Sequence, residues 1–305
     1  MSRVRARMRT GLVALVGIAA LLPLAGCGPG TPAAAHWAEA GASASSSDPG
    51  AASSGPGPTS AGPSPSGSAS SKSSASPPTS GALDLRAVSG KTVLVDPGHN
   101  GGNGAHPEII NQLVPMGTGT KPCDTTGTST NSGYSEAAFT FDVATRLVSL
   151  LKAAGAKVVT TRSDNIGVGP CVDKRAAIGN EARAAVAVSI HGDGGPSGGH
   201  GFHVMEPAKV GAPSDAIIGP SHQLALKVRD SFRARTGVPP ATYIGTNGIN
   251  TRSDMAGLNL STVPKVLIEC GNMRNSGDAA IMASPGGRQK MAEGIAAGLA
   301  AFLAG

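Results

Sequence analysis

The sequence is poor in aromatic and charged residues, and this limits the partners it can have. Aromatic residues make up 3% of the 305 positions, and no basic stripe with interleaved aromatics occurs. Proteins that bind nucleic acid usually carry such a basic surface, so we expect no nucleic-acid partner. The net charge is +6, but residues 1–26 contribute four arginines and no acid, which leaves +2 for the remainder. That weak positive balance is compatible with an anionic polymer as substrate.

A long apolar run is also missing. The apolar stretch of residues 11–25 is too short to span a bilayer comfortably and contains Pro23. Because arginines precede it, residues 1–26 have the form of an export signal. The signal ends in a Leu-Ala-Gly-Cys string that resembles a bacterial lipoprotein processing site, which implies cleavage before Cys27 and lipid attachment to its thiol. An ordinary signal peptide or an uncleaved anchor is the alternative, and either would also export the chain.

Large apolar side chains are scarce from about residue 28 to residue 80, where Ala, Ser, Gly and Pro dominate. Ordering such a segment costs roughly 1–2 kcal/mol per residue and buries little apolar surface, so we expect a disordered tether. A flexible tether of about fifty residues reaches on the order of 40 Å. We therefore divide the chain into a signal (1–26), a tether (27–88) and one folded domain (89–305).

The folded domain alternates strand and helix patterns and has no internal repeat. Short segments rich in Val and Ile predict strands at residues 92–95, 157–161, 185–190, 201–205 and 265–269. Helical spacing predicts a helix that Ser135 caps and Gly155 ends, and further helices at residues 173–184, 222–236 and 286–303. This alternation predicts a single α/β domain with a mostly parallel central sheet and helices on both faces.

Two histidines and two glutamates lie where chemistry is expected in such a fold. His99 (in Asp-Pro-Gly-His), His191 (in Ser-Ile-His) and Glu269 each follow a predicted buried strand, and Glu136 opens a predicted helix. Side chains at the carboxyl ends of parallel strands gather at one edge of the sheet. Two imidazoles and a carboxylate are the usual ligands of a hydrolytic zinc ion, and a second carboxylate can then transfer protons. Taken singly, each has a simpler explanation, such as a turn, a hydrogen-bonded histidine or a helix-dipole partner.

Four other histidines compete for a metal role: His106, His200, His203 and His222. No His-Glu-x-x-His string of a metalloprotease occurs. The two histidines of the His-Gly-Phe-His string enter a strand with a spacing that turns their rings to different faces. We expect all four to be structural residues or to lie at the edge of the cleft.

The residues of these motifs and their order along the chain resemble those of the zinc-dependent N-acetylmuramoyl-L-alanine amidases of peptidoglycan turnover. The resemblance covers roughly residue 91 to the C-terminus. It implies Zn²⁺ bound by His99, Glu136 and His191, with Glu269 as the catalytic acid and base. It further implies that the substrate is peptidoglycan, and that this autolysin cuts the amide between N-acetylmuramic acid and L-alanine. From the Leu-Ala-Gly-Cys string we expect the enzyme to be lipid-anchored in the membrane and to face the cell wall. We expect a monomer.

Two other functions remain open at this point. The first is a non-catalytic lipoprotein that binds the wall or regulates a partner, which should have lost at least one of the four residues; all four are present. The second is a zinc peptidase acting on another peptidoglycan amide bond, because zinc, water and a glutamate would serve any amide. The choice of bond therefore rests on the resemblance alone.

The chain has four cysteines, and one of them, Cys27, is assigned to the lipid. The other three are consistent with one disulfide and one free thiol in an oxidising compartment. We favour a bond between Cys123 and Cys171, both in loops on the strand-end side, with Cys270 turned away from the cleft by strand alternation. Three reduced thiols are the alternative. Cys123 lies in a long loop, residues 100–133, whose length is typical of a functional or disordered segment.

Overall fold

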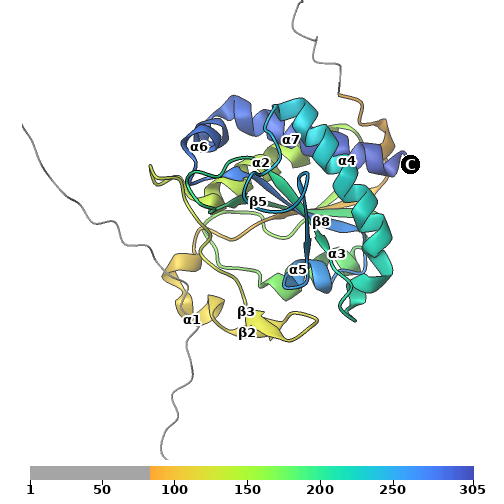
Figure 1. The fold of residues 1–305 in the computed structure, drawn as a ribbon. Coiled ribbons are helices and arrows are strands. Elements are labelled where there is room, and N and C mark those ends of the chain that lie inside the picture. Colours follow the sequence, from red (N-terminus) through yellow and green to blue (C-terminus); the bar gives the residue numbers. More distant parts are fainter. Residues whose placement is uncertain (1–82) are drawn as a thin grey trace, which may run out of the picture. The chain divides into compact units, whose positions relative to one another are not determined.

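The computed structural model describes residues 83–305 (Figure 1). The predicted signal, the lipidation site Cys27 and nearly all of the predicted tether lie outside the described residues. Within residues 83–305, no helix has both the length and the apolar character needed to cross a bilayer. Leu85 and Val88 pack into the core, so the folded part begins ahead of residue 89, where we placed its start.

A six-stranded sheet with the order β4-β1-β5-β8-β6-β7 forms the centre of the domain. β4, β1, β5 and β8 run parallel, whereas β6 is antiparallel to β8 and parallel to β7. The expected α/β fold with a mostly parallel sheet is confirmed. The strands are β1 (Thr92–Pro97), β4 (Lys157–Thr160), β5 (Val186–Asp193), β6 (His203–Pro207), β7 (Ile249–Arg252) and β8 (Lys265–Asn272).

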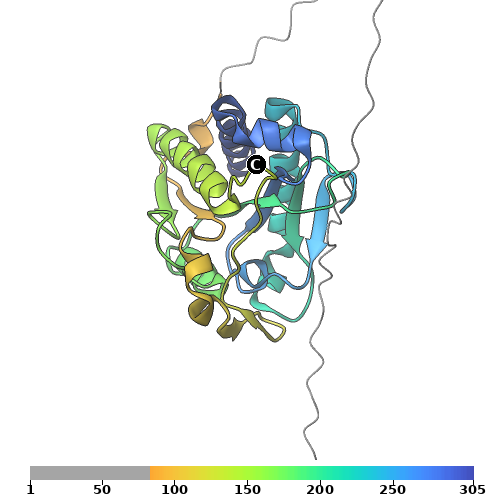
Figure 2. The same ribbon diagram turned by 90° about the vertical axis from the view of Figure 1, so that its left-hand side faces the viewer.

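Helices cover both faces of this sheet (Figures 1 and 2). On one face lie α2 (Glu136–Ala153), α4 (Ile218–Thr236) and α7 (Pro285–Leu303), with α6 (Ser276–Ala283) beside α7. On the other lie α3 (Val172–Glu181) and α5 (Ala256–Asn259). Strand alternation divides the core between the two faces: Val93 and Val95 join the large cluster, and Leu94 packs against Ala184 and Ala187. Burial on both faces explains why these strands are almost continuously apolar.

The start of α2 is fixed by local sequence, and this matters because its first residue is Glu136. The side chain of Ser135 accepts a hydrogen bond from the backbone N–H of Ala138 at 3.3 Å, which makes it the predicted N-cap. The helix ends at Ala153, and Gly155 follows with φ +84°, a left-handed conformation that glycine adopts without strain. The helix therefore begins at Glu136 because capping chemistry places its first turn there.

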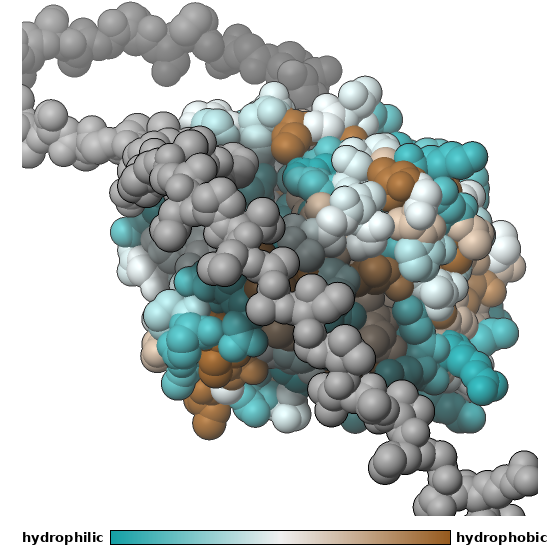
Figure 3. All heavy atoms as spheres, turned by 90° about the horizontal axis from the view of Figure 1, so that it is seen from below, coloured by the Kyte–Doolittle hydropathy of each residue, from teal (hydrophilic) through white to brown (hydrophobic). Residues whose placement is uncertain are grey.

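The long loop of residues 100–133 has structure of its own that the sequence did not predict. It contains two short helices, η2 (Asn103–Ala105) and α1 (Pro107–Ile110), and a small hairpin of β2 (Leu113–Pro115) and β3 (Thr120–Pro122). The strand β7, the helix α6, and the short helices η1 (Arg86–Val88), α5 and η3 (Pro213–Ile217) were also not predicted, because each is short and has little periodicity. Seen from below, the visible surface is largely hydrophilic with separate apolar spots (Figure 3).

Candidate metal centre and catalytic site

The three predicted ligands converge in the structure. One ligand atom each from His99, Glu136 and His191 lies within 4.8 Å of the others, in an arrangement that can hold a metal ion. His99 follows β1, and Glu136 is the first residue of α2. His191 and Glu269 lie within β5 and β8, not after them as we expected, because the pairing of these neighbouring strands continues through both residues.

Glu136 is the centre of this cluster. Its Oε1 lies 2.9 Å from Nδ1 of His191 and accepts a hydrogen bond from the backbone N–H of Gly192. Its Oε2 lies 3.2 Å from Nε2 of His99 and accepts a bond from the N–H of Thr128 at 2.9 Å. Burial opposes ionisation, but the charge of His99 and the hydrogen bonds from both imidazoles outweigh it and lower the pKa of Glu136. The carboxylate is therefore ionised and faces two imidazoles.

The electrostatics at His99 favour a positive charge. Burial works against protonation of the ring, yet the neighbouring Glu136 carboxylate, together with a hydrogen bond to Asp124, raises its pKa to about 10. The same field attracts any cation placed between the three side chains. A metal ion would take the position that the electrostatics otherwise give to a proton.

Two glycines make the close approach of these side chains possible. A Cβ on Gly98 would lie 2.2 Å from Cε1 of His191, well inside van der Waals contact. A Cβ on Gly127, which has φ +74°, would lie 2.8 Å from Oε2 of Glu136 and from Cδ2 of His99. The glycine before His99 is thus required by packing against the second histidine.

Glu269 lines the same cavity as the cluster but differs from Glu136 in its hydrogen-bond partners. It is 8% exposed, and its Oε2 has no hydrogen-bond partner among the described residues. Burial, followed by the negative charges of Glu136 and Asp193, raises its pKa well above the usual value. A carboxyl group without a protein partner is suited to accept a proton from a bound water or to donate one.

The four residues face a common cavity of about 360 Å³. Its wall also includes Lys121 from the hairpin and Leu258 from α5. The unexpected elements of the long loop thus form part of the wall. A volume of this size falls in the range of roughly 300–1,000 Å³ that is typical of ligand sites in proteins.

The competing histidines do not join the cluster. His106 and His222 are partly exposed and lie beside Glu108 and Glu206, respectively, and His200 is exposed. His203 is fully buried in β6, opposite Glu269 on the neighbouring strand, and neither ring nitrogen has a partner in the described part of the chain. Burial lowers its pKa to about 4, so the ring is neutral at neutral pH. These positions agree with the structural or cleft-edge roles we expected.

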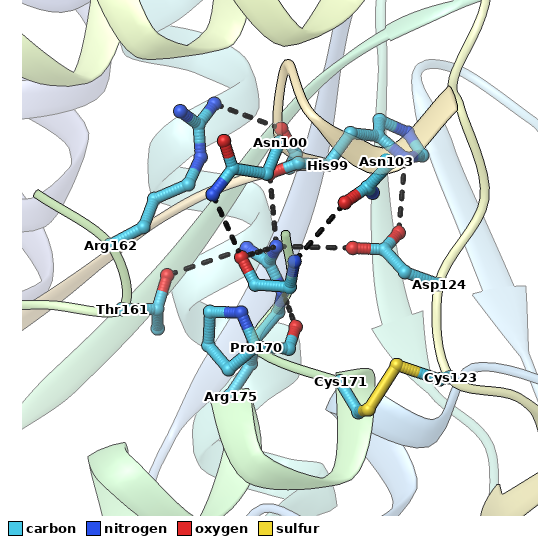
Figure 4. A network of polar contacts seen from close by, with 12 residues as sticks. His99, Asn100, Asn103, Cys123, Asp124, Thr161, Arg162, Pro170, Cys171 and Arg175 are labelled. Carbon is cyan, nitrogen blue, oxygen red and sulfur yellow. Dashed lines mark hydrogen bonds and ion pairs between the residues drawn. A yellow bond between two sulfur atoms is a disulfide. The ribbon is translucent and has the colours of Figure 1, made fainter. Parts of the chain in front are cut away.

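Cys123 and Cys171 form a disulfide, the pair that the sequence favoured. Cys270 is buried with a free thiol, and burial raises its pKa well above the usual value. The disulfide joins the loop after β3 to the N-cap of α3. It lies beside a polar network around His99 (Figure 4).

Sequence reasoning missed the buried ionic residues of this network. Asp96 is 3% exposed and is hydrogen-bonded or paired with Lys265 at 3.3 Å, Arg175 at 3.0 Å, Ser189 at 2.5 Å and Thr161 at 2.7 Å. The aspartate of the Asp-Pro-Gly-His string is thus a structural anchor. An acidic residue at the end of an apolar strand was the only local sign of this role.

Comparisons with known proteins identify the family of the chain. A family model described as N-acetylmuramoyl-L-alanine amidase matches residues 93–301. The chain is 48% identical over 219 residues to N-acetylmuramoyl-L-alanine amidase Rv3717 of Mycobacterium tuberculosis, covering 71% of this chain and 88% of the relative. It resembles the crystal structure of the amidase Ami1 from Mycobacterium smegmatis with a TM-score of 0.67 and 48% identity, covering 71% of this chain and 98% of the other. AmiC2 of Nostoc punctiforme, at 23% identity and a TM-score of 0.54, covers 71% of this chain and 99% of its own and shares the fold.

Proposed function

The chain belongs to the N-acetylmuramoyl-L-alanine amidase family, and on that premise we propose that it cuts peptidoglycan as a zinc enzyme. The bond is the amide between N-acetylmuramic acid and the L-alanine of the stem peptide. His99, Glu136 and His191 hold the zinc ion, and Glu269 is the catalytic residue. The observation that carries this proposal is the His-Glu-His cluster, together with a buried glutamate on the neighbouring strand whose Oε2 has no hydrogen-bond partner within residues 83–305.

The donor set fits zinc. Two imidazole nitrogens and one carboxylate oxygen are the protein ligands of many catalytic zinc sites, which keep a fourth position open. Both histidines turn a ring nitrogen toward Glu136, and that carboxylate is ionised. A zinc ion bound there would lower the pKa of a water molecule and polarise the scissile carbonyl.

Glu269 supplies the proton transfers. Its unpartnered Oε2 takes a proton from the attacking water and then donates it to the departing nitrogen of L-alanine. The raised pKa supports both steps, because it makes the carboxylate a stronger base than an ordinary glutamate and leaves the carboxyl group able to act as an acid. Such a group typically contributes roughly 10²–10⁴-fold in rate.

The ligand assignment is tested by metal analysis of the His99→Ala and His191→Ala variants. Each variant, shown to be folded by circular dichroism, should lose stoichiometric zinc, because two ligands do not hold the ion at neutral pH. His222→Ala is the matched control, since His222 lies outside the cluster and should retain one zinc per chain. Stoichiometric zinc in the His99 and His191 variants contradicts the assignment.

The choice of bond is tested by mass spectrometry of products from purified peptidoglycan. An amidase releases intact stem peptides that begin with L-alanine and leaves the glycan lactyl groups free. A peptidase would release shortened peptides and leave L-alanine attached to muramic acid, which would overturn the assignment of the bond. A lack of any product from zinc-loaded protein would favour the non-catalytic wall-binding role.

We further propose that the protein is exported and anchored to the membrane by lipid on Cys27. Support comes from the arginine-rich apolar segment that ends in the Leu-Ala-Gly-Cys string. Intact-mass analysis of the mature protein should find an acylated N-terminal cysteine. Cys27→Ser should move the protein from the membrane fraction to the soluble fraction, and a wild-type chain that is already soluble and unmodified contradicts the anchor.

A further inference from the structure

Asp124 contacts the ring of His99 on the side away from Glu136. Oδ1 of Asp124 lies 3.1 Å from Nδ1 of His99, and Nε2 of the same ring faces Glu136. The aspartate is 5% exposed and lies in the loop that follows β3. The imidazole is therefore held between two carboxylates, one at each ring nitrogen.

The second carboxylate oxygen of Asp124 is also occupied. Oδ2 accepts a hydrogen bond from Nη2 of Arg175 at 3.1 Å, and Oδ1 accepts another from the backbone N–H of Thr125 at 2.8 Å. These bonds fix the plane of the carboxylate, so its position does not depend on His99 alone. Oδ1 of Asp124 is therefore positioned to accept a hydrogen bond from the Nδ1–H of the imidazole.

Arg175 holds the backbone of His99 as well as its partner. The Nη2 that binds Asp124 also donates to the carbonyl oxygen of His99 at 2.9 Å. His99 needs this support, because its φ of +57° lies in the left-handed region, which costs a residue other than glycine about 1 kcal/mol or more. One buried guanidinium thus stabilises both the strained main chain and the side-chain acceptor (Figure 4).

Arg175 is in turn fixed by the fold. It is 3% exposed in the first turn of α3, and Nη1 donates to Asp96 at 3.0 Å and to the carbonyl of Pro97 at 2.7 Å. The disulfide joins the residue before Asp124 to the N-cap of the same helix. The disulfide therefore links the segment that carries Asp124 to the helix that carries Arg175, and both residues contact His99.

We infer that Asp124 is a positioning residue for the metal site: it accepts the Nδ1–H of His99 and so directs Nε2 toward the metal. This inference rests on the proposed function. A histidine that binds a metal through one nitrogen commonly donates the other N–H to a carboxylate, which fixes the tautomer and makes the ring a stronger ligand. Asp124 is placed to act through His99, and no contact with a substrate is required.

A purely structural role would predict something else. If Asp124 only neutralised Arg175, its loss would lower the stability of the fold and leave the zinc affinity of the folded protein unchanged. The carbonyl of Thr125, 3.1 Å from Nδ1 of His99, could then serve as the acceptor. Zinc affinity separates the two roles, because a neutral carbonyl does not replace the effect of a charged acceptor on the ligand.

The test is the zinc dissociation constant of the full chain, measured by competition with a chromophoric chelator at neutral pH. Asp124→Asn should raise the constant by about 10–100-fold, the usual effect of removing such a carboxylate. Asp230→Asn removes the same charge from an exposed site and should leave the constant unchanged. A constant for folded Asp124→Asn equal to that of the wild type overturns the inference.

Asp96→Asn provides a second comparison, because it removes a carboxylate from the same guanidinium without touching His99. Its zinc constant should change less than that of Asp124→Asn. An equal rise in both variants would assign the effect to Arg175 and overturn the role of the Asp124–His99 bond.

The wild-type protein offers a test that needs no variant. In a nitrogen-15 NMR spectrum of the zinc-loaded chain, His99 should carry its proton on Nδ1, and that proton should exchange slowly with water. Metal bound through Nδ1, or a rapidly exchanging proton, overturns the inference even if Asp124→Asn does not fold. Wild-type protein that binds no zinc contradicts the proposed function, whereas tight binding that Asp124→Asn leaves intact contradicts only this inference.

Discussion

The two glutamates of the site differ in how their oxygens are satisfied. Both oxygens of Glu136 have partners, from two imidazoles and two backbone N–H groups, whereas Oε2 of Glu269 has none among the described residues. The pKa is lowered at Glu136 and raised at Glu269. A carboxylate whose two oxygens both have partners is fixed in place and ionised, which suits metal binding. A carboxylate whose oxygen has no partner can accept and donate a proton. Two glutamates that face the same cavity thus take different roles because their surroundings differ.

The largest effect is expected when Glu269 loses its ability to accept a proton. Glu269→Gln should lower the rate of stem-peptide release by roughly 10²–10⁴-fold, because the amide cannot accept the proton of water. Zinc should remain stoichiometric, since the cluster of His99, Glu136 and His191 is untouched. Turnover is measured on muramyl peptides and metal by elemental analysis.

Glu136→Gln is the matched comparison, and it should lose zinc together with activity. Glu269→Gln should not destabilise the metal-free protein, because burial and the charges of Glu136 and Asp193 already favour the uncharged form of Glu269. A zinc-loaded Glu269→Gln protein that works at the wild-type rate would show that another group transfers the proton.

The next effect concerns the buried support beneath the ligands. Asp96→Asn should destabilise the fold by about 3–5 kcal/mol at pH 7, because it leaves Lys265 and Arg175 buried with one partner fewer. Burial opposes ionisation of Asp96, but the two cations lower its pKa. Its contribution is therefore present above the unfolded pKa of about 3.9 and is lost as the pH falls toward the folded value. The difference in the free energy of unfolding between Asp96→Asn and the wild type should therefore shrink by about 1.4 kcal/mol per pH unit below pH 4.

Denaturant unfolding at pH 7 and at pH 3 measures this difference, with Asp230→Asn as the exposed control. A difference of the same size at both pH values would mean that the loss comes from packing and not from the ion pairs.

The disulfide between Cys123 and Cys171 should stabilise the fold by an amount similar to or smaller than that of Asp96. It closes a loop with a sequence separation of 48, for which chain entropy predicts about 4 kcal/mol, and measured losses span roughly 2–5 kcal/mol. The double variant Cys123→Ser, Cys171→Ser should therefore unfold at lower denaturant concentration. It should also bind zinc more weakly than the wild type but more tightly than Asp124→Asn, since the bond from Arg175 to Asp124 remains. A double variant as stable as the wild type would contradict the structural role of the bond.

The smallest effect concerns the residue next to Glu269 in sequence. Cys270 is fully buried on the core side of β8, and its pKa is raised, so thiolate is scarce. The native protein should therefore resist alkylation by a maleimide at neutral pH and react at one site after denaturation without reductant. Rapid labelling of the native protein would place the thiol in the cleft with Glu269.

Much of the fold, and the residues of the ligand cluster, could be predicted from the sequence. Runs of Val and Ile predicted β1, β5 and β8, and Ser135 and Gly155 marked the ends of the α2 region. The reason is that hydrophobic periodicity and capping chemistry act over a few residues, so local pattern reports them. Because parallel strands end at one edge, the convergence of His99, His191 and Glu269 followed from that pattern as well.

Only the tertiary structure decided what supports these residues. Asp124 lies 25 residues after His99 and Arg175 lies 76 residues after it, in loop and helix segments whose local sequence shows no sign of the contact. Such contacts depend on the path of the long loop, which the β2–β3 hairpin and the disulfide determine. Whether a buried carboxylate is fully partnered or left free also depends on side chains from distant strands and helices. The sequence alone therefore identified which residues could do the chemistry, and the packing of distant segments decided how each one is held.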